Sequence, residues 1–367
     1  MKVKIITDSM NGKLTGVGNY TRNVVENVER SNIIIEKINY KKITEDTKIY
    51  KNILEGKILE TYGWYLTLPL RIKKEENVII HNTSGAPTFF RFKNKSIFTV
   101  HDLTPITHGN KHKLGKKWIF QLFLPRTLKY ADRIVAMSEN TKKDILKCYP
   151  KIDKTKIKVV YPYASEDFRI IKDKKALLNC RKKYNLPEKF FLYVGTLEPR
   201  KNIDNILKAI AEIYNKVKIP LVIVGTKGWK YNSIFKKYRD LNLDKRVFFT
   251  GYVNQQDLPT IYNLAICLIY PSFYEGFGLP PLEAMKCGTP VITSNTSSLP
   301  EVVGNSEIMI DPNSVEELEQ KMYKVATDKK LREKLRSQGL ERSKKFNKED
   351  FARKIISIYE ELVPENK

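Results

Sequence analysis

The chain has 367 residues, with 66 Lys and Arg against 41 Asp and Glu, so its net charge is +25. This length is more than one ordinary α/β domain needs and fits two, and a hydrophobic fraction of 41% can supply two cores. The four cysteines lack the short paired spacing of a zinc site or a disulfide framework, and no stretch reaches the roughly 20 apolar residues of a membrane span.

Charge and the amino terminus bear on partners and location. A basic surplus of this size suits nucleic acid, anionic lipid headgroups or a phosphorylated substrate, and it suits a solvated lysine-rich surface equally well. The first residues, MKVKIITDSM, run directly into a strand pattern and lack the apolar core and cleavage site of a signal peptide. We therefore expect a cytoplasmic protein.

Strand and helix patterns alternate along the chain in two series. The first series has predicted strands at residues 2–7, 78–81, 97–101, 134–137 and 157–161, and helices at 17–29, 118–130 and 139–147. The second has strands at 190–194, 221–224, 247–250, 264–270 and 291–293, and helices from 203, 279 and 315. Repeated strand-helix units predict α/β architecture: two Rossmann-like domains, each a parallel sheet with helices on both faces. The charged stretch at 162–175 marks the boundary.

Residues 272–290 read SFYEGFGLPPLEAMKCGTP and contain two glutamates. Pro280 and Pro281 suit the first helical positions, which places Glu283 in the opening turn of a helix from Leu279 and Glu275 on the loop before it. The unpaired amides and positive dipole end of such a helix favour a phosphate or sugar hydroxyls. Because the segment follows an apolar strand, it lies at the sheet edge where ligands bind. A loop glutamate and a helix-dipole glutamate without a ligand are the plainer alternative.

Four motifs in order give the second half of the chain a family resemblance. They are FLYVGTLEPRKN at 191–202, LVIVGTKGW at 221–229, VFFTGYV at 247–253 and the glutamate segment. Together they resemble the donor-binding domain of GT-B retaining glycosyltransferases of family four, the glycosyl transferases group 1. The first half agrees through TGVGNYTRNV at 15–24, TVHDLTP at 99–105 and ADRIVAMSENTKKDI at 131–145. The whole resembles the branch with mannosyltransferases of cell-surface polysaccharide assembly.

The resemblance implies a domain arrangement. Two Rossmann-like domains would face each other across a cleft in the GT-B manner. Residues 1–165 would form the acceptor-side domain, completed by the carboxyl-terminal helix 347–367, and residues 170–346 would bind the nucleotide sugar.

The same resemblance implies roles for individual residues. Arg200 and Lys201 would neutralise the departing diphosphate without a metal, Glu275 would hold the sugar ring and Glu283 the ribose hydroxyls. His101 would contact the transferred sugar or the acceptor. Backbone contacts to the donor are implied for Gly16, Gly18, Gly225, Tyr252, Val253, Phe277, Gly278 and Leu279. One departure is Thr196, which stands where many members carry arginine directly after a glycine; whether Arg200 compensates is left open.

The expected activity is metal-independent, retaining transfer of a mannose- or glucose-type hexose from a nucleotide diphosphate sugar to a glycan or lipid-linked acceptor. The chain has no Asp-x-Asp pair, and no permanently bound cofactor and no nucleic acid are expected. The branch favours GDP-mannose, while UDP- and ADP-sugars stay open. Alternatives are another GT-B enzyme, such as a sugar-nucleotide epimerase or a phosphorylase, and a polyanion-binding protein without chemistry.

Residues 111–129, KHKLGKKWIFQLFLPRTLK, combine six basic residues with three aromatic ones. This composition suits an anionic membrane interface or a lipid diphosphate acceptor, which would make the protein peripheral at the inner membrane face. The alternative is that Trp118, Phe120 and Phe123 pack inward, because the helix precedes a core strand.

Overall fold

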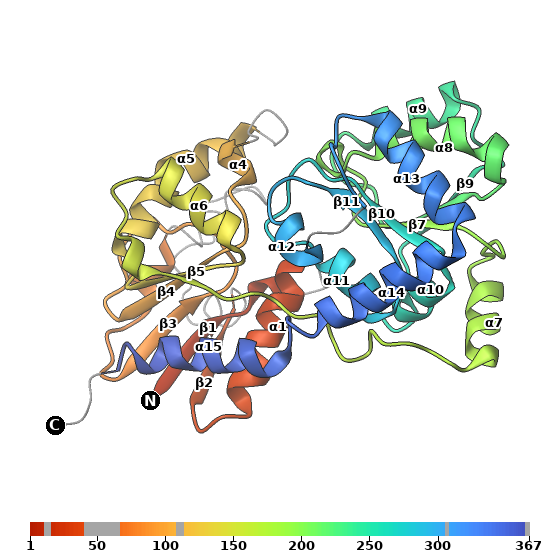
Figure 1. Ribbon diagram of the computed structural model, residues 1–367. Helices are drawn as coiled ribbons and strands as arrows, with labels where there is room; N and C mark the ends of the chain where they lie inside the picture. Colours follow the sequence, from red (N-terminus) through yellow and green to blue (C-terminus); the bar gives the residue numbers. More distant parts are fainter. Residues whose placement is uncertain (11–15, 40–66, 108–113, 305–307, 364–367) are drawn as a thin grey trace. The chain divides into compact units, whose positions relative to one another are not determined.

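We describe the chain from a computed structural model, which covers residues 1–10, 16–39, 67–107, 114–304 and 308–363. The chain divides into two compact units, Met1–Pro162 with Lys348–Lys367, and Tyr163–Asn347. Each unit has a parallel sheet with helices packed on it (Figure 1). The prediction of an α/β fold with two Rossmann-like domains is confirmed.

The first unit is built on a six-stranded parallel sheet in the order β2-β1-β3-β4-β5-β6. Its strands are β1 (Lys2–Ile6), β2 (Ile34–Ile38), β3 (Val78–Asn82), β4 (Lys95–Val100), β5 (Arg133–Ala136) and β6 (Ile157–Val159). Its helices are α1 (Gly16–Glu29), α4 (Thr104–Thr107), α5 (Leu114–Tyr130), α6 (Glu139–Cys148) and α15 (Lys348–Glu360), with 3-10 turns η1 (Asp8–Met10) and η4 (Lys154–Lys156).

Alternation along the strands assigns these helices to opposite faces of the first sheet. Phe98 and Val100 of β4 join a core with Leu124 of α5 and Ile145 of α6. On the other face, His81 of β3 bonds to a tyrosine of α15, and α1 packs against α15 (Figure 1). The last described helix of the chain thus completes the core of the first unit.

The second unit repeats the design with strand order β12-β11-β10-β7-β8-β9, and the neighbouring strands again pair in parallel. Its strands are β7 (Phe191–Val194), β8 (Leu221–Val224), β9 (Val247–Gly251), β10 (Cys267–Tyr270), β11 (Val291–Ser294) and β12 (Met309–Ile310). Its helices are α7 (Lys174–Lys183), α8 (Ile203–Val217), α9 (Tyr231–Asp240), α10 (Leu258–Leu264), α11 (Leu279–Lys286), α12 (Leu299–Val303), α13 (Val315–Thr327) and α14 (Lys329–Ser343), with η5 at Pro199–Lys201.

The helices of the second unit fall into two packed groups. Helix α8 packs against α13, while α11 packs against α10 and α14 (Figure 1). Strands β7, β8 and β10 are fully buried, as expected of a parallel sheet covered on both faces.

Two details of the predicted elements are wrong. Residues 264–270 were expected to form one strand, but Leu264 ends α10 and the strand begins only at Cys267. The apolar run spans both elements because Leu264, at the end of the helix, and Ala265 and Ile266, before the strand, are partly buried. The short strands β2 and β12 lie at sheet edges and were absent from the predicted series, since an edge strand needs no continuous apolar run.

Candidate functional site

The loops after β7 and β10 meet at the carboxyl edge of the second sheet. From β7 the chain moves outward to β8 and β9 and then returns to β10 on the other side of β7. Loops diverge at such a topological switch point, and open α/β sheets bind ligands there. The loop after β7 carries Arg200 and Lys201, and the loop after β10 carries Glu275.

These three side chains, with Tyr270, form the switch-point cluster. The Lys201 Nζ lies 2.7 Å from Oε1 of Glu275 and 2.8 Å from the Tyr270 hydroxyl. The Arg200 Nη1 donates to Oε2 of Glu275 at 3.0 Å and to the Tyr274 carbonyl oxygen at 2.6 Å. One carboxylate therefore holds two cations from the neighbouring strand's loop.

Burial and charge act in opposite directions on the pKa values of this cluster. Burial raises the pKa of Glu275, but the Arg200 and Lys201 charges outweigh it and hold that pKa at about 2. Burial also lowers the pKa of Lys201, and the neighbouring Glu275 opposes that shift. Glu275 is thus an anion over the whole physiological range.

The loop that carries Glu275 is held by the loop between β11 and α12. The Glu275 amide donates to the Ser297 hydroxyl at 3.0 Å. Ser298 donates to the carbonyl oxygens of Glu275 and Phe277 at 2.9 and 2.8 Å. Gly278 has φ +114°, and a Cβ there would lie 2.8 Å from Leu299, so glycine is required at this bend. Leu279 then opens α11 with an unpaired first-turn amide.

Glu283 differs from Glu275 in its surroundings, and its predicted position in the opening turn of the helix is wrong. It is the fifth residue of α11 rather than part of the opening turn. Its Oε2 accepts a hydrogen bond from the Tyr262 hydroxyl at 2.9 Å, and burial raises the pKa of its carboxyl to about 7. Within the described residues no cation offsets this shift in pKa, in contrast to Glu275.

The loops after β8 and β9 also reach this edge. Gly225 has φ +152°, and a Cβ on it would lie 1.9 Å from the Gly195 carbonyl oxygen, so the loops after β7 and β8 touch backbone to backbone. After β9, the Tyr252 side chain is 51% exposed while Val253 is buried. A ligand at this edge would meet the tyrosine ring and the backbone of these loops. Thr196 is exposed in the loop after β7.

The remaining predicted residues belong to the first unit. Gly16 and Gly18 both lie in the first turn of α1, Gly16 exposed and Gly18 buried. His101 follows β4, and its Nε2 lies 2.7 Å from the Thr83 carbonyl oxygen. Because a carbonyl only accepts, Nε2 carries the proton and Nδ1 is the acceptor of the neutral ring. Burial lowers the pKa of His101, which favours that neutral form.

His81, in β3, makes a hydrogen bond through each ring nitrogen. Its Nδ1 lies 2.7 Å from the Tyr359 hydroxyl and its Nε2 lies 2.9 Å from Oγ1 of Thr99. Burial lowers its pKa to about 3. Nδ1 thus joins β3 to α15, and Nε2 joins β3 to the neighbouring strand β4.

The predicted set lacked four residues that shape the site: Tyr270, Glu198, Trp229 and Gly85. Glu198 binds Arg200 and Trp229, with Oε1 2.7 Å from the arginine Nη2 and Oε2 3.0 Å from the indole Nε1. A Cβ on Gly85 would lie 2.9 Å from Cδ2 of His101, so this glycine admits the ring. Glu198 could have been predicted from the sequence, because it lies two residues before Arg200 in the same motif. Nothing in the sequence indicated the contact between Gly85 and His101.

The segment 111–129 is described only in part. Residues 111–113 and the side chains of 114–117 lie outside the described set. Phe120 is buried, as inward packing requires, but Trp118 and Leu122 are 61% and 63% exposed. Among the described helices none is both long and apolar enough to cross a bilayer.

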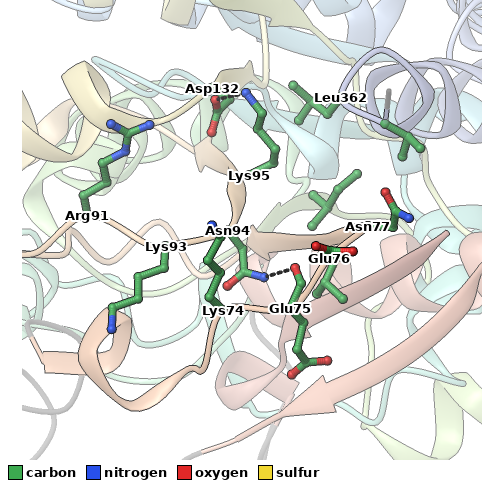
Figure 2. A pocket seen from close by; sticks show the side chains of 13 residues that line it. Lys74, Glu75, Glu76, Asn77, Arg91, Lys93, Asn94, Lys95, Asp132 and Leu362 are labelled. Atoms are coloured by element: carbon green, nitrogen blue, oxygen red, sulfur yellow. Dashed lines mark hydrogen bonds and ion pairs between the residues drawn. The ribbon is translucent and has the colours of Figure 1, made fainter. Parts of the chain in front are cut away.

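A pocket of about 460 Å³ lies at the amino-terminal edge of the first sheet, where β3 and β4 begin (Figure 2). Arg91, Lys93 and Lys95 line it together with Glu76 and Asp132. Its lining contains none of the predicted site residues. In the described part of the chain no group of three His, Cys, Asp or Glu side chains is placed to hold a metal ion.

Two family models match the chain, one in each unit. Glycosyltransferase Family 4 matches residues 16–165, and Glycosyl transferases group 1 matches residues 179–342. The switch-point cluster lies within the second match. The chain belongs to the glycosyltransferases that combine these two domains.

Named relatives and solved structures agree with this glycosyltransferase assignment. The chain is 29% identical to O-antigen chain mannosyltransferase B of Escherichia coli, covering 99% of this chain and 100% of that protein. The fold matches sucrose-phosphate synthase of Thermosynechococcus elongatus with a TM-score of 0.76 at 22% identity, over 98% of both chains. It matches Anabaena Alr3699/HepE, solved in complex with UDP-glucose, with a TM-score of 0.74 at 16% identity, over 99% and 100%. The predicted GT-B family is therefore confirmed.

Proposed function

We propose that this glycosyltransferase moves a hexose from a nucleotide diphosphate sugar to a glycan or lipid-linked acceptor, with retention and without a metal. The observation that carries the proposal is the pairing of Glu275 with Arg200 and Lys201 at the switch point of the second sheet. Residues 170–346 would bind the donor, and residues 1–165 with 347–367 would serve the acceptor.

The cations give the departing diphosphate its charge partners. Lys201 and Arg200 lie at the carboxyl edge, in the loop after β7. At the same edge α11 opens with one N–H donor, that of Leu279, because Pro280 and Pro281 have none. Preorganised donors of this kind contribute about 3 to 4 kcal/mol each to stabilising a developing anion. The two cations and the amides of Phe277, Gly278 and Leu279 would donate hydrogen bonds to the diphosphate in the absence of a metal ion.

Glu275 has the properties of a sugar-positioning group rather than a nucleophile. Its pKa of about 2 makes it a weak base, and both its oxygens already accept hydrogen bonds from fixed cations. A same-face mechanism then fits best. The acceptor oxygen bonds to the anomeric carbon as the bond to the diphosphate oxygen breaks on the same face, and the acceptor proton passes to the leaving phosphate.

The donor's other contacts follow from the neighbouring loops. Glu283 would bind the ribose hydroxyls, and Gly225, Tyr252 and Val253 would border the base. In the first unit, the neutral His101 would accept from a sugar or acceptor hydroxyl through Nδ1, and the amides of Gly16 and Gly18 would approach the diphosphate.

The sugar and the base are inferred from the relatives. A protein named O-antigen chain mannosyltransferase B that aligns over the full length favours mannose and a polysaccharide acceptor. HepE was solved with UDP-glucose, so the uridine donor is the direct competitor of the GDP-mannose that we favour. No nucleic acid partner is proposed.

We place the acceptor near an anionic membrane surface. Trp118 and Leu122 are exposed on successive turns of α5, and Arg126 and Lys129 continue the same exposed stripe. An indole and an aliphatic side chain flanked by cations suit the headgroup boundary of a bilayer. Sedimentation with anionic vesicles, compared between the wild-type protein and Trp118→Ser, measures this contact.

A thermal-shift panel of GDP, UDP and ADP, each with and without its sugar, tests the donor site. We expect one base to raise the melting temperature and the sugar to add to it. If no nucleotide stabilises the protein, the donor site is wrong, and steeply salt-dependent polyanion binding would then favour a binding protein. With the active donor, NMR of the product shows whether the anomeric configuration is retained, and activity after chelation tests metal independence.

A further inference from the structure

Glu198 occupies a central place between two loops of the carboxyl edge. Its carboxylate receives Nη2 of Arg200 on one oxygen, at 2.7 Å, and the Trp229 indole N–H on the other, at 3.0 Å. The Arg200 and Glu198 side chains are each only 14% exposed. Glu198 therefore joins the loop after β7 to the loop after β8 and holds one end of the guanidinium.

The same contact sets the local charge. Arg200 lies between two carboxylates, Glu198 and Glu275, and Lys201 shares the second of these. Two cations and two anions sum to zero at this place. A diphosphate that binds here would add negative charge to a neutral cluster. The negative charge of Glu198 would repel the diphosphate, while its hydrogen bond would orient Arg200 toward it.

We propose that Glu198 is a positioning residue that fixes Arg200 for the leaving diphosphate and, as a counter-charge, keeps the nucleotide from binding too tightly. This inference rests on the proposed donor site. Glu198 would then have two effects. Its charge would weaken nucleotide binding and so raise Kd, and its hydrogen bonds would position Arg200 and so raise kcat. A residue that only stabilised the fold would not affect the two in opposite directions.

The experiment compares Glu198→Gln with Glu198→Asp in the full-length protein. Calorimetry gives the Kd for whichever nucleoside diphosphate stabilises the wild-type protein, and steady-state kinetics with the matching sugar donor gives kcat. Glutamine removes the charge and keeps only one accepting oxygen, so we expect Kd to fall about threefold to tenfold at low salt and kcat to fall at least about tenfold. Aspartate keeps the charge, so its Kd should stay near the wild-type value.

Glu188→Gln is the matched control. Glu188 is exposed and lies just before β7, at the amino-terminal edge of the same sheet. The substitution therefore removes one negative charge, as Glu198→Gln does, without changing the cluster. Its Kd and kcat should equal the wild-type values. Circular dichroism and melting temperature identify any variant that fails to fold, and Trp229→Phe then tests the indole bond while keeping the Arg200 pair.

The outcomes separate this inference from the proposed function. If the wild-type protein binds no nucleoside diphosphate, the donor site itself fails. If the wild-type protein binds one and Glu198→Gln leaves its Kd unchanged or raises it, the counter-charge role is wrong. A lowered Kd with an unchanged kcat would refute the positioning of Arg200.

Discussion

Lys201 and Glu275 form a buried ion pair, with Nζ 2.7 Å from Oε1 and both side chains about a tenth exposed. The pair joins the loop after β7 to the loop after β10, the two neighbouring strands at the topological switch point of the second sheet. Buried ion pairs gain little net stability because desolvation offsets attraction, but each partner depends on the other. The pair therefore sets the geometry of the site more than it stabilises the fold.

Lys201→Met should be strongly destabilising. It leaves the Glu275 carboxylate buried with one cation fewer, and breaking a buried pair costs about 3 to 5 kcal/mol. Urea denaturation followed by circular dichroism measures the loss. The double variant Lys201→Met/Glu275→Gln should recover part of it, because no unpaired charge is then left. Lys216→Met, which breaks an exposed pair with Glu319, should cost less than about 1 kcal/mol.

Glu275→Gln should reduce turnover more than donor affinity. The amide keeps the size of the side chain but loses the charge that holds Arg200 and Lys201 together. Misplacing a positioning group lowers the rate about 100-fold when the reacting atoms lose alignment. Steady-state kinetics should show this in kcat, with KM changed only severalfold. A variant with normal kcat and a large rise in KM would contradict the sugar-positioning role.

Glu283 should make stability fall as pH rises toward neutrality. Burial raises the pKa of its carboxyl from 4.5 to about 7 in the folded protein, so between these values the folded state binds more protons than the unfolded state. The stabilisation is complete below pH 4.5 and is lost as pH passes 7. Urea titrations at pH 5 and pH 8 should show a drop in the wild-type protein about 2 kcal/mol larger than in Glu283→Gln. Equal drops would show that Glu283 titrates normally.

The parallel sheets were predictable because their strands are buried on both faces. Residues 190–194 and 221–224 form uninterrupted apolar runs and became β7 and β8 almost without change. The edge strand Ile34–Ile38 reads IIEKI and gave no such run. Leu264 was predicted to begin a strand, but it is the last residue of α10. Hydrophobicity alone does not distinguish the end of a packed helix from the start of a strand.

The candidate site was predictable as a location but less so in its pairings. That Arg200, Lys201 and Glu275 share an edge follows from each standing after a parallel strand. That the cations bind Glu275 does not follow, because a sequence does not say whether a side chain turns toward solvent or toward the next loop. The contact between Gly85 and His101 depends on the register of β3 against β4, in which His81 lies opposite Ile97.

Gly85→Ala should displace His101 and lower activity. Gly85 has φ +70°, and its new Cβ would lie 2.9 Å from Cδ2 of the imidazole, so the ring must move away from the Thr83 carbonyl oxygen that fixes its tautomer. The left-handed backbone alone costs roughly 1 to 2 kcal/mol. Gly304→Ala isolates that cost, because Gly304 has φ +78° and its nearest neighbour would be 3.5 Å from the new Cβ. We expect both variants to lose stability and only Gly85→Ala to match the reduced kcat of His101→Ala. Equal activity in the two glycine variants would show that the position of His101 is not needed for transfer.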